Sequence, residues 1–182
     1  MEMSNTQLVP ASAEQTWQAL NDPVTLKECI PGCESFDKVA ENEYALAMTA
    51  KVGPVSAKFK GKMRLEEVNP PQSYSLVFEG QGGAAGFAKG NAKVTLAPDP
   101  NGTQIAYTVH AQVGGKLAQI GSRLVDGAAK KMANDFFGAL VTRLGGTPKP
   151  MPETPRPAGK SNLWLWVALG IVVVVILYFL FR

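Results

Sequence analysis

Val55–Glu67 reads VSAKFKGKMRLEE, and this stretch decides the fold. Small or apolar residues alternate along it with polar ones: Val55, Ala57, Phe59, Gly61, Met63 and Leu65 against Ser56, Lys58, Lys60, Lys62, Arg64 and Glu66. A strand with one apolar and one polar face is typical of an antiparallel sheet covered on a single side. The chain must therefore supply a cover for the apolar face.

Further strands lie on both sides of this one. Alternation and turn residues predict them at Glu2–Val9, Glu34–Val39, Glu43–Ala50, Tyr74–Phe78, Val94–Leu96 and Ile105–Val109. Ser12 and Gln15 form the capping pattern of one short helix, and Pro23 opens a second, which ends at the Ile30-Pro31-Gly32 turn. We expect six or seven antiparallel strands.

The cover is a long helix near the C-terminal end of the domain. From Lys116 to Leu144 the apolar residues recur at steps of three and four, at Leu117, Ile120, Leu124, Val125, Ala128, Met132, Phe136, Leu140 and Leu144. The predicted fold class is therefore α+β: a curved antiparallel sheet of six or seven strands around one long helix of about seven turns.

Small residues occur where the sheet and the helix should meet. The helix carries Gly121, Gly127, Ala128, Ala129 and Gly138, and the inward strand positions include Gly61, Ala88, Gly90 and Ala92. Two interpretations remain open: a hollow between sheet and helix, or close backbone packing at small residues.

A second apolar region ends the chain. Leu163–Phe181 has no charged residue, and at about 1.5 Å per helical residue it would span a hydrocarbon core of roughly 30 Å. Trp164, Trp166 and Tyr178 lie near its ends, where a bilayer favours aromatic rings. We expect a transmembrane helix and three parts: a domain over 1–144, a proline-rich tether over 145–162 and an anchor over 163–181.

Charges around this apolar region predict its orientation. Lys149, Arg156 and Lys160 precede it and only Arg182 follows, which predicts a single-pass tail anchor in the cytoplasmic (inner) membrane with the domain facing the cytoplasm. A cytoplasmic domain argues against a disulfide between Cys29 and Cys33.

The sequence offers little for catalysis. The single histidine, His110, shares its strand parity with Thr108 and Gln112 and so belongs to the polar face. Cys29 and Cys33 have no further soft ligand nearby, and the glycine-rich segment Gly80–Gly90 leads into a strand where a phosphate loop would start a helix. We expect no catalytic residue, no metal and no covalent cofactor.

One strand face is basic. Its candidate residues for docking a partner or a membrane are Lys58, Lys60, Lys62, Arg64, Lys89 and Lys93. An ordinary solvated sheet face is the competing interpretation. Nucleic acid is not expected as a partner, because the net charge is only +3 and no aromatic residues lie among the lysines.

Several stretches together resemble one family. They are Ile30–Cys33, Lys51–Val55 with Phe59–Gly61, Gly86–Gly90, Gly114–Leu124 and Phe136-Phe137. The order of elements resembles the START-like helix-grip fold of the SRPBCC superfamily, and within it these stretches resemble the G-subunit family of carbon monoxide dehydrogenase. The resemblance covers nearly all of residues 1–144.

The resemblance implies a non-enzymatic accessory protein. It would recruit a molybdenum hydroxylase of the aerobic carbon monoxide dehydrogenase type to the cytoplasmic membrane and bind a quinone, menaquinone or ubiquinone, as electron acceptor. A purely structural membrane adaptor, or a lipid-binding protein with no role in electron transfer, remains an alternative. An enzyme acting in the cavity would need an inward polar constellation, which the sequence does not assemble.

Candidate ligand-binding residues follow from this expectation, with ordinary core packing as the competing interpretation. They are Ile30, Pro31, Gly32, Phe59, Met63, Phe78, Phe87, Tyr107, Leu117, Ile120, Leu124, Ala128 and Phe136.

Overall fold

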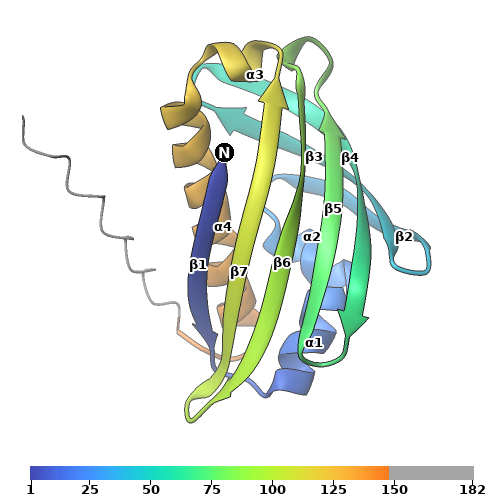
Figure 1. The fold of residues 1–182 in the computed structure, drawn as a ribbon, viewed down its shortest axis with the longest axis vertical. Helices are drawn as coiled ribbons and strands as arrows, with labels where there is room; N and C mark the ends of the chain where they lie inside the picture. The colour runs from blue at the N-terminus through green and yellow to red at the C-terminus, as the bar shows by residue number, and fades with distance from the viewer. Residues whose placement is uncertain (148–182) are drawn as a thin grey trace, which may run out of the picture. The chain divides into compact units, whose positions relative to one another are not determined.

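The structure is a computed structural model that describes residues 1–147. Its elements, shown in Figure 1, follow in chain order: β1 (Glu2–Val9), α1 (Ala13–Asn21), α2 (Pro23–Cys29), β2 (Cys33–Ala40), β3 (Glu43–Val52), β4 (Val55–Asn69), β5 (Ser73–Gln81), the single 3-10 turn η1 (Gly83–Ala85), β6 (Phe87–Asp99), β7 (Gly102–Gly114), α3 (Lys116–Gln119) and α4 (Ser122–Arg143). The decisive stretch Val55–Glu67 lies within β4.

All strands within residues 1–147 belong to one antiparallel sheet. It has seven strands in the order β1-β7-β6-β5-β4-β3-β2, so β2 to β7 form a continuous meander and β1 joins its far edge. The register of β1 on β7 runs from Glu2 opposite His110 to Val9 opposite Thr103. The prediction of an antiparallel sheet of six or seven strands is confirmed.

Helix α4 covers one face of the sheet, behind β1 and β7 in the view of Figure 1, while α1 and α2 lie at its lower end. The core between them is apolar, because the inner strand positions and one stripe of α4 both turn towards it. Its most buried members include Val9, Ile105 and Leu140.

The long helix expected over Lys116–Leu144 is interrupted. The structure divides it into α3 and α4 at Ile120 and Gly121, and Gly121 has a φ of +91° and a ψ of 147°, a positive-φ conformation that glycine adopts readily and that interrupts the helical backbone. The sequence pattern missed this break because the apolar period continues across it.

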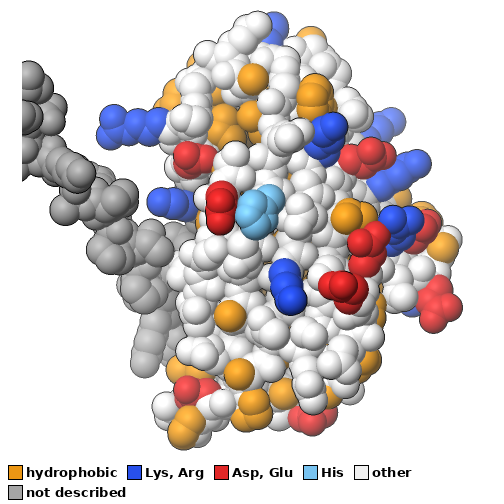
Figure 2. Space-filling view, in the orientation of Figure 1, with side chains coloured by type: hydrophobic (Ala, Val, Ile, Leu, Met, Phe, Trp, Pro, Cys, Tyr) orange, Lys and Arg blue, Asp and Glu red, His pale blue; other side chains and the backbone are white. Residues whose placement is uncertain are grey.

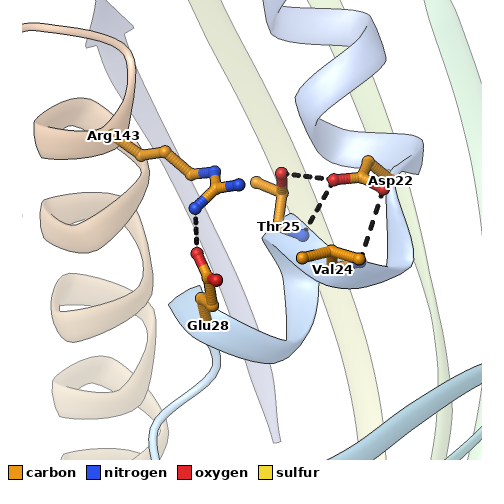
Figure 3. Close-up of polar contacts among 5 residues, drawn as sticks. All are labelled: Asp22, Val24, Thr25, Glu28 and Arg143. Carbon is orange, nitrogen blue, oxygen red and sulfur yellow. Dashed lines mark hydrogen bonds and ion pairs between the residues drawn. The ribbon is translucent and has the colours of Figure 1, made fainter.

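Local hydrogen bonds begin α1 and α2 as predicted. The Ser12 hydroxyl accepts from the Gln15 backbone N–H at 3.2 Å, which completes a capping box. The Asp22 carboxylate accepts from the Thr25 hydroxyl at 2.6 Å and the Thr25 backbone N–H at 2.9 Å, and these bonds lower the pKa of Asp22. Figure 3 shows this cap beside the ion pair of Glu28 and Arg143, which links α2 to α4.

The expected transmembrane helix requires a correction. Among residues 1–147, no helix is long and apolar enough to cross a membrane. The longest, α4, carries charges such as Arg123, Asp126 and Lys130, which a lipid-exposed helix would have to desolvate. The fold of the described residues is accordingly an α+β domain alone, and the location in the cytoplasmic membrane, which depended on the extra helix, is not retained. Residues 148–162 of the expected tether and the expected anchor, 163–181, lie outside the described residues.

Candidate functional site

The inner face of the sheet is built from rows of residues that the strand register sets side by side. One row reads Tyr44, Met63, Phe78, Gly90 and Ala111. The next row towards α3 reads Leu46, Gly61, Gly80, Ala88 and Val113. Of the three adjacent small residues in the middle of this second row, Gly80 has no atom closer than 4.0 Å to the position of a Cβ, whereas at Gly61 the Leu46 side chain lies 3.3 Å from that position.

Burial falls along the sheet from the end near α1 to the end near α3, here called the α1 end and the α3 end. At the α1 end, Ile105 is 1% exposed and Leu140 of α4 is fully buried. Towards the α3 end the inward side chains are only half-buried: Leu46, Met63, Leu76, Phe78, Val109 and Val113 on the strands, and Ile120, Ala128, Met132 and Phe136 on the helical side. The apolar side chains on these strand positions and on the helical side are packed less completely than the core, and we call the region between them the hollow.

Backbone contacts at glycines bound the hollow at the α3 end. The tip of the β3–β4 hairpin reaches α4, since a Cβ on Gly53 would lie 3.3 Å from Cδ1 of Leu124. Gly86, next to η1, lies against Gly115, which precedes α3, and the ring of Phe59 lies against Gly82. These close approaches fix the hairpin, η1 and α3 around the end of the hollow.

The structure brings most of the predicted ligand residues to the hollow. Met63, Phe78, Ile120, Ala128 and Phe136 are half-buried at its walls. Leu117 and Tyr107 are buried, and Leu124 lies at the rim with 47% of its surface exposed. Phe59, half-buried, contacts Gly82 at the α3 end.

The placement of Phe87 at the ligand site was wrong. Strand alternation sets Phe87 on the opposite face from Ala88 and Gly90, where it is 37% exposed and its ring covers Gly114. We expected Phe87 among the inward strand residues, but the alternation along β6 assigns it to the outer face.

The Ile30-Pro31-Gly32 bend is fixed to the sheet edge. The Gly32 carbonyl accepts from the Thr49 backbone N–H of β3 at 2.9 Å, and Gly32 has a φ of +72°. Ile30 is half-buried against the core, and Pro31 next to it is half-buried as well. The bend therefore borders β3 as a rigid corner.

The two cysteines flanking this bend are free thiols. Cys29 is buried, and Cys33 donates from Sγ to the Ser35 carbonyl at 3.3 Å. Burial raises the pKa of both thiols, which disfavours the reactive thiolate. Within the described part of the chain, no group of three or more His, Cys, Asp or Glu residues could hold a metal ion.

Three tyrosines project from the inner face: Tyr44, Tyr74 and Tyr107. Burial raises the pKa of each, so their hydroxyls stay protonated at neutral pH. The Tyr107 hydroxyl is buried without a hydrogen-bond partner among the described residues, as are one carboxylate oxygen of Asp126 and the hydroxyl of Thr16.

Sequence reasoning missed several residues of the hollow. They are Leu46, Leu76, Val109, Val113 and Met132. Strict application of the inward parity on every strand would have found the first four, and the apolar period of the helix already contained Met132. No sequence pattern indicated the distance between the inner face of the sheet and α4.

The predicted basic surface is less basic than expected. The register places Glu79 between Lys62 and Lys89, and Glu43 opposite Arg64. Lys58 is paired with Glu34, and Arg64 with Glu66 at 2.7 Å. Figure 2 shows acidic side chains among the basic ones on the outer face of the sheet.

A groove hollows this outer face over a volume of ≈ 1180 Å³. Its lining includes Lys62, Arg64 and Lys89 together with Glu43 and Glu79. Lys60 and Lys93 are exposed on the same face. His110 also lines the groove, and its Nε2 lies 3.4 Å from Oε1 of Glu2. This position confirms the predicted place of His110 on the polar face.

Comparison with known proteins identifies relatives of the whole domain. The family described as the G subunit of carbon monoxide dehydrogenase (CoxG) matches residues 6–145. A conserved protein from Geobacillus kaustophilus has 31% sequence identity and a TM-score of 0.75, over 80% of this chain and 95% of that chain. No curated protein sequence matches the chain.

More distant structures share the fold alone. The Zhui aromatase/cyclase from Streptomyces sp. R1128 has 9% identity and a TM-score of 0.60, over 80% of this chain and 93% of that one. A protein from Thermus thermophilus has 16% identity and a TM-score of 0.60, and the match covers 79% of this chain and 97% of that chain. The architecture is thus the helix-grip fold that the sequence predicted.

Proposed function

The chain belongs to the CoxG family of carbon monoxide dehydrogenase, and from that premise we propose that it is an accessory protein that binds a quinone-like apolar ligand in the hollow. The observation that carries the proposal is the set of half-buried apolar residues on the inner strand positions and on α4, with the open position at Gly80 among them. Binding of an apolar ligand would remove these half-exposed apolar side chains from water, which stabilises the complex by roughly 25 cal/mol for each Å² of apolar surface buried.

Binding without catalysis is the interpretation that the inner face favours. The polar groups at this face include neutral tyrosine hydroxyls, Gln7, Thr103 and one buried oxygen of Asp126 on α4, which do not form the nucleophile-and-base pairing that covalent catalysis needs. The single histidine lies on the outer face of the sheet. We therefore propose that the protein carries its ligand unchanged.

The proposed partner is a molybdenum hydroxylase of the aerobic carbon monoxide dehydrogenase type, and the family description supports this choice. The outer groove, with Lys62, Arg64 and Lys89 among carboxylates, offers a mixed-charge surface for it. In this proposal the bound menaquinone or ubiquinone accepts the electrons of the partner.

The first test is ligand binding by the full chain. Ala128 faces the hollow, so Ala128→Phe should fill it and weaken binding of menadione or ubiquinone-1 about tenfold or more, because overpacking costs about 1–3 kcal/mol. Lys130→Phe places the same ring on the exposed side of α4 and should leave binding within about twofold. Equilibrium dialysis measures both.

The alternatives give different results. No binding of either quinone by the wild-type chain would leave a structural adaptor as the better account. Tight binding of phospholipid with no quinone binding would favour a lipid-binding protein. The electron-transfer part is tested separately, since addition of the protein should speed quinone reduction by the purified hydroxylase, and an unchanged rate would contradict it.

A further inference from the structure

Tyr107 occupies a fixed place on the inner face of the sheet. It projects from β7 between the paired residues Val94 of β6 and Asn5 of β1. Its ring stacks on Phe137 of α4, with centroids 5.2 Å apart and an angle of 23° between the planes. Packing between sheet and helix therefore sets the direction of the hydroxyl.

The same residue lies where the packed core gives way to the hollow. The preceding inward residue of β7, Ile105, is 1% exposed, whereas the following one, Val109, is half-buried. On the helix, Phe137 is buried while Phe136 and Met132 are half-buried. Tyr107 thus lies at the boundary between the packed core and the hollow, and we call this boundary the floor of the hollow.

The hydroxyl at this floor has an unmet hydrogen-bonding capacity. Tyr107 is 7% exposed, and its oxygen is buried without a hydrogen-bond partner among the described residues. Buried tyrosine hydroxyls usually find a partner, so an unpaired one needs an explanation. A ligand that brings an acceptor oxygen to the floor would supply one.

We propose that the Tyr107 hydroxyl donates a hydrogen bond to an acceptor oxygen at the buried end of the ligand. The hollow would then select apolar molecules that carry a carbonyl or similar acceptor over hydrocarbons of the same shape. This inference rests on the proposed function, since it assigns the polar contact of the same ligand. Burial raises the pKa of Tyr107, so the donor keeps its proton across neutral pH.

The test compares two probes that differ only in their acceptors. Menadione carries two ring carbonyls, and 2-methylnaphthalene is the corresponding hydrocarbon without them. We expect the full-length wild-type chain to bind menadione more tightly than the hydrocarbon. Tyr107→Phe removes the hydroxyl and keeps the ring, and it should weaken menadione binding about three- to tenfold, the range of one net hydrogen bond, with the affinity for 2-methylnaphthalene unchanged.

The matched control is Tyr74→Phe. Tyr74 lies in the same row of the inner face, but its ring meets Trp17 edge-on at 5.5 Å in the packed core, and its hydroxyl is not among the buried unpartnered atoms. This variant should change binding of neither probe. Thermal unfolding of all three proteins checks that the substitutions leave the domain folded.

The outcomes separate the two proposals. Equal effects of Tyr107→Phe on both probes would indicate a structural role and overturn the inference. Binding of both probes with no effect of Tyr107→Phe would also overturn it and leave the hollow as a ligand site. Failure of the wild-type chain to bind either probe would instead contradict the proposed function.

Discussion

Gly90 and Gly80 lie on adjacent strands of the inner face, yet their surroundings differ sharply. A Cβ on Gly90 would lie 2.0 Å from the carbonyl oxygen of His110, which belongs to the backbone and cannot swing aside. A Cβ on Gly80 would have its nearest neighbours at 4.0 Å. One glycine is required by close backbone approach, and the other leaves open space.

We therefore expect opposite tolerance at these two positions. Gly90→Ala should lower the free energy of unfolding by about 1–3 kcal/mol, because the backbone must shift to admit the methyl group. Gly80→Ala should change it by less than about 0.5 kcal/mol. Urea unfolding of the full chain measures both, and similar losses in the two variants would contradict this account.

For single residues, the sequence predicts well which face of the sheet a side chain occupies and predicts poorly how close the neighbouring backbone lies. Parity correctly assigned Met63 to the inner face, where it packs against the core, and His110 to the outer face, where it pairs with Glu2. It also assigns Phe87 outward, although Phe87 was expected among the inward ligand-binding residues. Nothing in the sequence distinguishes Gly80 from Gly90, because their difference depends on how closely β7 approaches β6.

At the scale of secondary-structure elements, the break before α4 can be tested by comparing one substitution at the break with the same substitution inside α4. Gly121 has a φ of +91° and open space around it, so a methyl group there costs only backbone strain. Gly127 lies within α4, again with open space around its Cα. The same change to alanine acts on a left-handed residue in one case and on a helical residue in the other.

The two variants should shift stability in opposite directions. Gly121→Ala should lower the free energy of unfolding by about 1–2 kcal/mol, since L residues avoid the left-handed region. Gly127→Ala should raise it by about 0.5–1 kcal/mol, because alanine is the better helix former. Thermal denaturation followed by circular dichroism shows whether the signs differ; equal signs would refute the assignment of the break.

Element order was largely predictable. Alternation located the strands, and Ser12 with Gln15 located α1 through its capping box. The break at Gly121 was not predicted, because Leu117, Ile120 and Leu124 continue a helical period across it. The apolar period indicates which side of a helix is apolar, but it does not indicate where the helix axis changes direction.

For the domain as a whole, the contrast between a packed α1 end and an open α3 end makes a quantitative prediction. Leu140→Ala should lower the free energy of unfolding by about 2–5 kcal/mol, because Leu140 is 0% exposed and its removal leaves a cavity. Leu76→Ala removes the same atoms at the half-buried wall of the hollow and should cost about 1–2 kcal/mol.

Urea unfolding of both leucine variants checks the contrast. A cost for Leu76→Ala as large as that for Leu140→Ala would mean that the walls of the hollow are packed as tightly as the core. Binding of menadione supplies a second measurement, since only the Leu76 variant alters a wall of the proposed site.

For the whole domain the sequence predicted the helix-grip architecture, but it did not predict how closely the sheet and the helix pack. The inward small residues Gly61, Ala88, Gly90 and Ala92 were compatible with both a hollow and close packing, and Gly90 proves to be a site of close backbone packing. The transmembrane helix inferred from hydropathy is not among the helices of residues 1–147. Hydropathy describes a segment in isolation, whereas the hollow depends on how sheet and helix are spaced.

The position of β1 has a consequence for synthesis of the chain. β1 leaves the ribosome before the other strands of this sheet, but its partner is β7, so the pairing of Glu2 with His110 must wait for nearly the whole domain. The meander from β2 to β7 can form strand by strand in the meantime, because each strand pairs with its predecessor. Until β7 emerges, the nascent β1 has an unmatched edge, and the slow closing step of folding is the capture of the N-terminal strand.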